Sequence, residues 1–357
     1  MNILIVKLSA IGDVIHTLPS LAELRKLYPG SHITWVIEEA SSDLILGHPY
    51  LDKVIVSRRK QWISDLKRGK IGNILQEIKT FIHELRSRPY DLVIDFHGLL
   101  KSAVVVLLSS GKRKLGYDSM QELSGLFFKE KIPEDMKKHA VDRYLDFIRY
   151  LGAEIKQPDF LIPITEENRE KVETLLQLNG IDGREQFVAV NPVALWKTKL
   201  WGNDKFACLC DRIAEELKVP VVLTGSNAED AVRIQSMMKT SAINLGGQTT
   251  LRDLAYLYKR ASLLITTDSG PMHLAAALRT PVVAIFGPTD PSRTGPYGKG
   301  HTVIQKTLSC SPCFLKSCDS HECMHDISVE EMFHAVQEKL MGNASPDTGK
   351  EDTYGRN

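Results

Sequence analysis

The sequence predicts an α/β protein made of two doubly wound domains, each with a parallel sheet between helices. A chain of 357 residues is too long for one ordinary core, and its 43% hydrophobic content is typical of globular proteins. Short β-branched runs alternate with longer stretches of helical spacing in the first half of the chain, and again in the second. This repetition predicts two similar halves that face each other across a cleft.

The first half opens with residues 2–7, an apolar and β-branched run expected of a buried parallel strand. A turn around Gly12 follows, and a helix is predicted from about Asp13 to beyond Pro19. Residues 1–160 form the first predicted domain. Its further strands are predicted at residues 33–37, 53–57 and 91–96.

The second half begins after an extended stretch at residues 159–163 and is predicted to form a domain over residues 161–341. The polar tail at residues 342–357 contains Gly and Pro and is predicted to be disordered. The predicted strands of this half are residues 187–191, 220–224, 263–267 and 281–286. Its predicted helices are residues 205–218, 228–239, 251–260, 270–278 and 328–341.

The charge and hydropathy of the chain narrow its possible partners. The 45 basic and 44 acidic residues leave a net charge of +1, so no nucleic acid is expected as a partner. The first apolar run is interrupted by Lys7 and is too short for a signal peptide, and no run of about 18 apolar residues occurs. The sequence therefore predicts a cytoplasmic protein that meets any anionic partner through a local patch.

Asp13 comes shortly after the first predicted strand, at the edge where ligands of open α/β sheets bind. A carboxylate that faces the cleft is suited to taking a proton as a general base. The alternative is a helix N-cap, because Asp is favoured there and its charge suits the positive end of the helix dipole. Both interpretations are open from the residues alone. A dinucleotide fingerprint is not present, since it needs three glycines and only Gly12 is found here.

The segment TTDSGPMH at residues 266–273 runs from a predicted strand directly into a predicted helix. Asp268 or Ser269 can cap this helix, and Gly270 lets a ligand approach the backbone. The N–H groups at the helix start would bind an anion such as a diphosphate, toward which His273 would also point. The alternative is a plain strand-to-helix turn with a packed histidine.

Two further strand ends carry charged residues. Lys197 and Lys199 follow the predicted strand at residues 187–191 and lie between two tryptophans. A lysine there would neutralise a leaving phosphate, although a solvated loop is the commoner place for lysine. Glu229 follows the strand at residues 220–224, where its carboxylate would accept hydrogen bonds from the hydroxyl groups of a ribose. The alternative is an acidic residue that stabilises a helix N-terminus.

Arg58, Arg59 and Lys60 form a tight basic cluster after the predicted strand at residues 53–57. A run of charges is usually a solvated face. On a domain that binds an acceptor, the cluster would instead suit a phosphorylated, carboxylate-bearing lipid and an anionic membrane surface.

Four cysteines lie within fourteen positions near the end of the chain, interleaved with His321 and His325. Without a secretory signal, a disulfide framework is not expected. Tetrahedral zinc takes such ligands, although a zinc ribbon separates its two pairs further. A structural zinc site and free thiols are both open, and the candidate ligands are Cys310, Cys313, Cys318 and Cys323.

Three segments, taken in order, resemble the lipopolysaccharide heptosyltransferases, which are glycosyltransferase family 9. They are ILIVKLSAIGDVIHTLP at residues 3–19, DSGPMHLAAA at 268–277 and FGPTDP at 286–291, and the similarity covers residues 1–305. Four shorter features are most like heptosyltransferase I. They are WVIEE at residues 35–39, the pair Arg58 and Arg59, DFHGLLKS at 95–102 and HAVDR at 139–143.

The resemblance implies a GT-B fold, with two Rossmann-like domains across a cleft, and an inverting transfer of heptose from ADP-heptose without a metal. The implied acceptor is the Kdo–lipid A inner core of lipopolysaccharide, which would place the protein peripherally at the cytoplasmic face of the inner membrane. Asp13 matches the general base, and Lys199 matches the lysine that stabilises the leaving diphosphate. The implied donor-binding residues are Ala194, Leu195, Lys199, Glu229, Thr249, Asp268, Ser269, Gly270 and His273. The implied acceptor-binding residues are Arg58, Arg59, Lys60 and Lys101.

Departures from the heptosyltransferase I pattern leave another activity of the same family open. Ala194 and Leu195 stand where the heptosyltransferase I pattern has two hydroxyl residues, and Ser269 replaces a Thr. A similar cysteine cluster occurs in some heptosyltransferase II-like members, so heptosyltransferase II or another enzyme of the family is the alternative. A nucleotide-sugar epimerase needs no lipid acceptor and would leave the basic cluster unexplained. A non-catalytic binding module is disfavoured by the presence of both Asp13 and Lys199.

Overall fold

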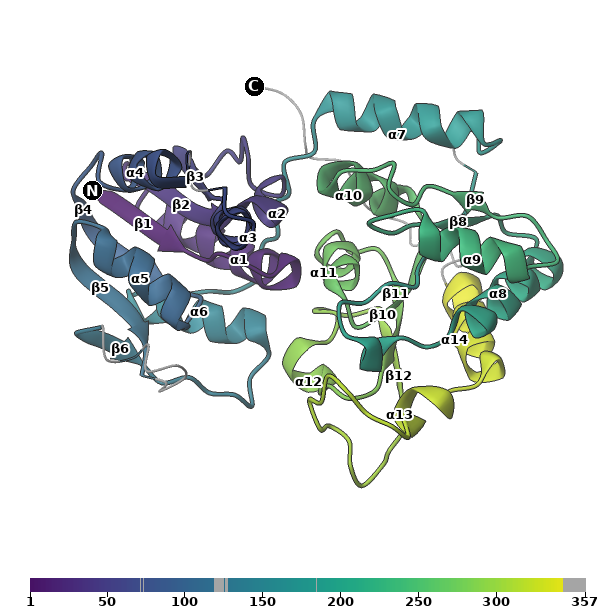
Figure 1. The fold of residues 1–357 in the computed structure, drawn as a ribbon. Coiled ribbons are helices and arrows are strands. Elements are labelled where there is room, and N and C mark those ends of the chain that lie inside the picture. The colour runs from purple at the N-terminus through teal and green to yellow at the C-terminus, as the bar shows by residue number, and fades with distance from the viewer. Residues whose placement is uncertain (71, 73, 119–124, 126–127, 184, 343–357) are drawn as a thin grey trace.

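The protein is described by a computed structural model in which two α/β domains lie side by side (Figure 1). The structure describes residues 1–357 except for residues 71, 73, 119–124, 126–127, 184 and 343–357. The tail predicted to be disordered therefore lies outside the described residues, except for Gly342, which ends the last helix. Among the helices that the structure describes, none combines the length and the apolar composition needed to cross a bilayer.

The N-terminal domain is built on a parallel six-stranded sheet in the order β3-β2-β1-β4-β5-β6. Alternate residues of β1 enter different cores, so that Ile3 and Ile5 pack on one face of the sheet and Leu4 and Val6 on the other. Both faces are buried, which explains why this strand is a continuous apolar run. The strands are β1 (Asn2–Val6), β2 (His32–Glu38), β3 (Lys53–Ser57), β4 (Tyr90–Asp95), β5 (Gly111–Tyr117) and β6 (Glu130–Ile132).

Helices cover both faces of this sheet. Side chains of α1 (Ile11–Leu27) and α6 (Ala140–Tyr150) belong to the core that contains Ile3. Side chains of α4 (Ile74–Leu85) and α5 (Leu100–Leu108) belong to the core that contains Leu4. The short helices α2 (Glu39–Ser42) and α3 (Arg59–Lys67) lie at the carboxyl ends of β2 and β3.

The C-terminal domain repeats this plan. Its parallel sheet has the order β12-β11-β10-β7-β8-β9, so the first and fourth strands of the domain are neighbours, as in the N-terminal sheet. The strands are β7 (Val188–Asn191), β8 (Val221–Leu223), β9 (Ile243–Asn244), β10 (Leu263–Thr267), β11 (Val282–Phe286) and β12 (Thr302–Gln305). The helices are α7 (Glu166–Leu178), α8 (Asn203–Arg212), α9 (Glu229–Met237), α10 (Leu251–Arg260), α11 (Gly270–Ala277), α12 (Pro291–Thr294), α13 (Glu322–His325) and α14 (Val329–Gly342).

This strand order confirms the predicted doubly wound fold class and locates the binding edge of each domain. The chain reverses its direction of winding between β1 and β4 in one sheet, and between β7 and β10 in the other. In such sheets, ligands bind at the carboxyl ends of the strands beside this switch point. The segments that follow these four strands therefore form the candidate site.

Several elements differ from the sequence-based prediction. Strands β5, β6, β9 and β12 were not predicted. In β5, the exposed residues Lys112 and Arg113 interrupt any apolar pattern, and β9 has only two residues. The helix predicted at residues 205–218 is α8 followed by a π-helical turn, Ile213–Leu217. Lys218 ends it with a φ of 57°.

The two domains meet where the N-termini of α1 and α11 touch. A Cβ atom built on Gly12 would lie 2.3 Å from Cδ2 of His273, and one built on Gly270 would lie 3.0 Å from Cγ2 of Ile11. Glycine is therefore required for this approach, because any side chain at position 12 would occupy the place of the imidazole. At another part of the interface, Arg252 Nε lies 3.0 Å from Asp43 Oδ1.

We predict that Gly12→Ala pushes the domains apart. The added methyl group overlaps the ring of His273, and overpacking of this kind costs about 1–3 kcal/mol. Gly12→Ala should therefore lower the melting temperature and increase the radius of gyration in small-angle X-ray scattering. Gly30→Ala is the matched control, because a Cβ atom at Gly30 meets nothing within 4 Å. Equal behaviour of the two variants would contradict the prediction.

Candidate active site

Asp13 lies in the first turn of α1, at the carboxyl end of β1 and beside the interface with α11. Ala10 occupies the N-cap position and Asp13 the N3 position, so the alternative interpretation of Asp13 as the N-cap itself is wrong. Its carboxylate nevertheless contributes to the cap, because the N–H of Ala10 donates to Oδ2 at 3.1 Å. The side chain is 43% exposed, so the carboxylate remains accessible from the cleft. Asp13 therefore stabilises the helix and also has a free face for chemistry.

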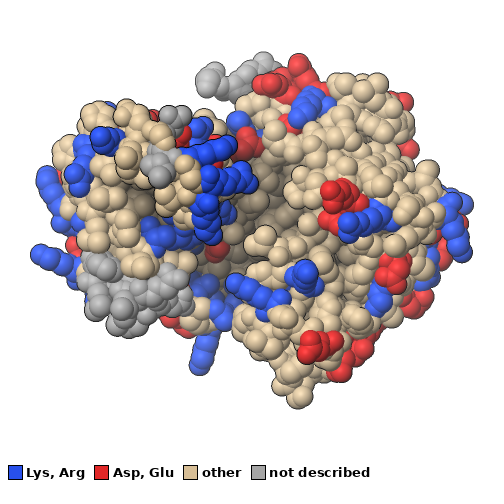
Figure 2. Space-filling view, in the orientation of Figure 1, with Lys and Arg blue, Asp and Glu red and all other residues tan. Residues whose placement is uncertain are grey.

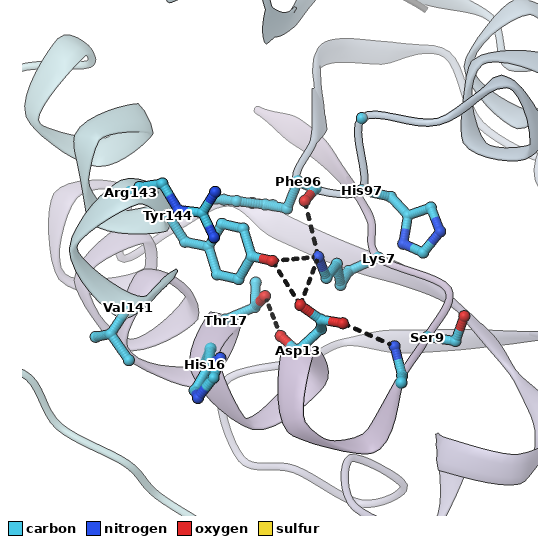
Figure 3. A network of polar contacts seen from close by, with 12 residues as sticks. Lys7, Ser9, Asp13, His16, Thr17, Phe96, His97, Val141, Arg143 and Tyr144 are labelled. Carbon is cyan, nitrogen blue, oxygen red and sulfur yellow. Dashed lines mark hydrogen bonds and ion pairs between the residues drawn. The ribbon is translucent and has the colours of Figure 1, made fainter. Parts of the chain in front are cut away.

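A buried network holds the other oxygen of this carboxylate (Figure 3). The hydroxyl of Tyr144, on α6, donates to Asp13 Oδ1 at 2.8 Å. Lys7 Nζ donates to the Tyr144 hydroxyl at 2.6 Å and to the carbonyl of Phe96 at 3.0 Å, and it lies 3.7 Å from Asp13 Oδ1. Burial acts to raise the pKa of Asp13, but the charge of Lys7 and the hydrogen bond from Tyr144 outweigh it and leave that pKa below its ordinary value.

Lys199 lies across the cleft in a short 3-10 turn, Lys197–Lys199, after β7. Its Nζ atom is 2.5 Å from Asp268 Oδ2, and the two side chains are only 15% and 5% exposed. Thr289 donates to the same Asp268 oxygen at 2.6 Å, and the ammonium lies 4.6 Å from the centroid of the Trp196 ring. Lys199 is thus a positioned, partly desolvated cation and not a solvated loop charge.

The start of α11 leaves its backbone donors uncapped by side chains. Ser269 is the N-cap residue but makes no side-chain cap bond, and its hydroxyl lies 3.2 Å from Thr266 Oγ1 instead. Gly270 begins the helix, and Pro271 follows with no N–H to satisfy. An uncapped helix start concentrates partial positive charge and suits an anionic ligand.

His273 is turned toward the N-terminal domain. Its Nδ1 atom lies 3.0 Å from Nε2 of His16 on α1, and the His139 ring is 5.2 Å from His16. His139 in turn hydrogen bonds the carbonyl of Gly295 at 3.0 Å. The imidazole predicted to face the donor anion therefore joins a cluster of three histidines between the domains.

The remaining predicted donor residues are spread around the C-terminal domain. Glu229 begins α9 and is 79% exposed, with Arg233 at 4.0 Å as its ionic partner. Thr249 is half-buried just before α10, and Ala194 is half-buried after β7. Leu195 is 93% exposed, which is unusual for leucine and leaves an apolar side chain open at this loop. The exposed carboxylate of Glu229 is therefore able to accept hydrogen bonds from hydroxyl groups of a ligand.

The predicted basic cluster is organised around a buried carboxylate. Glu38, 2% exposed at the end of β2, lies 2.9 Å from Arg59 Nη2, 3.5 Å from Lys60 Nζ and 3.7 Å from Lys101 Nζ. Arg58 pairs with Glu39 at 3.2 Å. The structure therefore brings the four predicted acceptor residues together at the ends of β2 and β3. The carboxylates of Glu38 and Glu39 balance two of their four positive charges. Figure 2 shows Lys and Arg gathered on the N-terminal domain beside the hollow between the domains.

The cysteine segment packs against the turn that carries Lys199. The Thr198 hydroxyl donates to the Leu315 carbonyl at 2.8 Å, and His321 Nε2 lies 2.7 Å from the Thr198 carbonyl. Cys323 is buried, and a Cβ atom built on Gly287 would meet its sulfur at 2.9 Å, whereas Cys310 and Cys318 are exposed. Within the described part of the chain, no three His, Cys, Asp or Glu side chains are gathered so that they could hold a metal ion. The zinc site predicted from the spacing finds no support in this geometry and stays a prediction.

The residues that sequence reasoning missed are Lys7, Tyr144, His16 and Glu38. Lys7 carried a signal, because a lysine within an apolar strand run must find a buried partner. Tyr144 carried none, since it lies 137 positions from Lys7 in the sequence. The pairing of His16 with His273 spans 257 positions and depends on how the two domains dock.

We predict that acid weakens the folded protein through the histidine cluster. Burial, despite the nearby Asp268 carboxylate, lowers the pKa of His273 from 6.5 to about 4. Exposed rings of the unfolded chain bind protons below pH 6.5, whereas this buried ring does so only near pH 4. Stability should therefore fall as the pH falls from 6.5 to 4, by roughly 1.4 kcal/mol per pH unit.

The measurement is the melting temperature at a series of pH values between 7.5 and 4. His273→Asn should reduce the pH dependence, and His83→Asn, at an exposed position on α4, should leave it as in the parent. A His273→Asn variant with the parent's full pH dependence would refute the role of this ring.

Comparison with known proteins identifies the family. Residues 78–324 match glycosyltransferase family 9 (heptosyltransferase). The chain is 31% identical to lipopolysaccharide heptosyltransferase 1 of Pseudomonas aeruginosa, over 89% of this chain and 87% of the relative. It is 30% identical to lipopolysaccharide heptosyltransferase 1 of Escherichia coli K12, over 85% of this chain and 93% of the relative.

A solved relative has the same fold. The E. coli heptosyltransferase WaaC with ADP superposes with a TM-score of 0.76 at 25% identity, covering 95% of this chain and 100% of WaaC. WaaC with ADP-2-deoxy-2-fluoro heptose gives a TM-score of 0.75, also at 25% identity, covering 96% of this chain and 100% of WaaC. The chain therefore belongs to glycosyltransferase family 9, the heptosyltransferases, and is a glycosyltransferase with the GT-B fold.

Proposed function

We propose that this enzyme transfers an L-glycero-D-manno-heptose residue from ADP-heptose to the Kdo–lipid A inner core of lipopolysaccharide, with inversion at the anomeric carbon. The two relatives above are named lipopolysaccharide heptosyltransferase 1, and WaaC was solved with ADP and with an ADP-heptose analogue. The observation that carries the proposal is the meeting of α1 and α11. It brings an accessible carboxylate, Asp13 in the first turn of α1, and a positioned cation, Lys199, to the surroundings of the same interface residue, His273.

In the proposed reaction, the acceptor hydroxyl attacks the anomeric carbon as ADP leaves with the electron pair of the broken C–O bond. Asp13 takes the proton of that hydroxyl, which a carboxylate on the attacking face can do alone. Lys199 and the N-terminus of α11 offset the negative charge that grows on the diphosphate. Glu229 accepts hydrogen bonds from the ribose. The positive charge comes from the chain itself, so the proposed transfer uses no metal.

Purified protein mixed with ADP-heptose and Kdo2-lipid A tests this function. ADP release that depends on the acceptor, together with an acceptor heavier by one heptose, is the expected result. The alternative, a heptosyltransferase II activity, predicts transfer only to an acceptor that already carries its first heptose. Absence of ADP release with either acceptor would refute both.

Asp13→Ala should lower kcat by roughly two to four orders of magnitude, the usual contribution of a general base. ADP binding, measured by calorimetry, should change little because the proposed donor residues belong to the other domain. Asp91→Ala is the control, since this carboxylate lies near the start of β4, at the opposite edge of the sheet. If Asp13→Ala keeps a kcat near the parent's value, Asp13 is not the general base.

The enzyme is further proposed to act in the cytoplasm, peripherally on the anionic inner face of the membrane that holds its acceptor. Arg58 and Lys60 of the basic cluster are 56% and 68% exposed. On α5, which begins beside this cluster, Leu100, Val104 and Leu107 are 46–48% exposed at helical spacing. Exposed apolar side chains beside cations suit the interface of an anionic bilayer.

Arg58→Gln combined with Lys60→Gln should raise the KM for the glycolipid acceptor. Each basic residue near an anionic surface contributes about 1 kcal/mol, so the rise should be up to roughly 30-fold at low salt. Salt should mimic the change, because exposed charges are screened beyond about 8 Å at physiological ionic strength. Lys131→Gln on the edge strand β6, combined with Lys137→Gln in the segment that follows it, is the matched control because both positions are exposed. An unchanged KM and salt response would show that the cluster is only a solvated face.

A further inference from the structure

Lys7 is a buried cation, and its hydrogen-bond and ionic partners among the described residues lie around Asp13. It follows β1, is 3% exposed, and directs Nζ to the Tyr144 hydroxyl, the Phe96 carbonyl and the Asp13 carboxylate. Taking an ammonium group out of water costs several kcal/mol unless its partners compensate. The groups around Asp13 must therefore compensate the burial of this ammonium.

Tyr144 links this cation to the carboxylate. Its oxygen accepts from Lys7 at 2.6 Å, and its proton is donated to Asp13 Oδ1 at 2.8 Å (Figure 3). The ring is 6% exposed and packs edge-on against Phe96 at a centroid distance of 6.1 Å, which fixes the hydroxyl in place. The phenol therefore lies between the ammonium and the carboxylate and orients both.

The carboxylate of Asp13 is held at both oxygens. Tyr144 occupies one lone pair of Oδ1, and the Ala10 N–H occupies one of Oδ2. Each carboxylate oxygen can accept a second hydrogen bond, and the 43% exposure of the side chain leaves room for an acceptor hydroxyl. Rotation of the carboxylate would break one of these bonds, so the direction in which it accepts a proton is fixed.

We propose that Lys7 and Tyr144 are positioning residues for the proton acceptor Asp13. They keep its carboxylate ionised in a partly enclosed site, and they fix the orientation of the lone pair that takes the proton of the acceptor hydroxyl. Neither residue touches the substrates. The inference rests on the role proposed for Asp13 and extends it to the groups that hold Asp13 in its working state.

The pKa shifts of Asp13 and Tyr144 have the directions that this arrangement requires, whereas burial lowers the pKa of Lys7 despite the nearby Asp13 charge. Burial and the neighbouring Asp13 charge raise the pKa of Tyr144 well above its ordinary value, so the phenol remains a hydrogen-bond donor. Lys7 and Tyr144 are the two largest of the causes that lower the pKa of Asp13 against the effect of burial, so loss of either should raise that pKa. The ionisable groups that face this network are Lys7 after β1, His16 on α1, Asp95 and His97 at the end of β4, Arg143 and Tyr144 on α6, and His273 on α11.

Tyr144→Phe tests the proposal because it deletes the hydroxyl and keeps the packed ring. With ADP-heptose and Kdo2-lipid A at saturation, kcat on the plateau should fall roughly 10–100-fold, the scale expected of a misplaced reacting group. The acid limb of the kcat–pH profile should move to higher pH by about one unit, because Asp13 loses a stabilising donor. Lys7→Met should move the limb in the same direction. The dissociation constant of ADP should stay at the parent's value in both variants.

Tyr117→Phe provides the matched control. Tyr117 is 4% exposed in the same core, packs on Phe147 of α6, and its hydroxyl has no hydrogen-bond partner among the described residues. It should keep the parent's kcat and pH profile. If Tyr144→Phe also keeps them, or if Tyr117→Phe loses activity to the same degree, the positioning role is wrong.

The outcome also separates this inference from the proposed function. An inactive Asp13→Ala with an unaltered Tyr144→Phe would overturn only the positioning role. An active Asp13→Ala would overturn the assignment of the base and, with it, the inference. If Lys7→Met does not fold, Tyr144→Phe still decides, since it removes a single oxygen atom and leaves the charged pair in place.

Discussion

The close approach of α1 and α11 is the contact on which the candidate site depends. Each helix follows an inner strand of its sheet, so the two helix N-termini project from the carboxyl ends of the sheets toward each other. Gly12 leaves the space that the His273 ring fills, and Gly270 leaves space for Ile11. Without these two glycines, Asp13 and the donor loop would belong to two separate surfaces. The proposed reaction requires Asp13 and the donor loop to lie on the same surface.

The sequence was informative where local pattern determines structure. Apolar runs predicted β3 and β10 at their observed bounds, and the residues after β1, β7 and β10 were predicted to line the cleft because parallel strands share one carboxyl edge. It was uninformative where strands are polar or short. The strand β5 has charged residues at its exposed positions, so neither apolar content nor alternation distinguished it from a loop.

The partners of the site residues were beyond any local pattern. Asp13 was found as a carboxylate at a strand end, but nothing in its neighbourhood indicated that Tyr144 holds it. The basic cluster was found as three adjacent cations, whereas the buried Glu38 that organises them lies on another strand. Pairings of this kind follow from the order of strands in the sheet and from the docking of helices, which a single sequence encodes only through the whole fold.

The charged groups of the site share one arrangement, in which each cation is paired with a carboxylate before any substrate arrives. Lys7 lies beside Asp13, Lys199 beside Asp268, and Arg59 beside Glu38. Desolvating two charges can cost more than their attraction returns, so such pairs are weak evidence for stability. Their effect is orientation, because a cation held in place needs no reorganisation when charge develops nearby.

The pair of Lys199 and Asp268 shows what this arrangement means for donor recognition. Asp268 is 5% exposed and also accepts from Thr289, so it cannot rotate away from the ammonium. A bound diphosphate would share Lys199 with this carboxylate, and the attraction in the ground state is correspondingly reduced. In the proposed reaction, negative charge would grow on the phosphate as its bond to the anomeric carbon breaks, while the charge on Asp268 stays constant. The share of Lys199 held by the phosphate would then increase, and the cation would stabilise the transition state more than the bound substrate, which is the condition for catalysis.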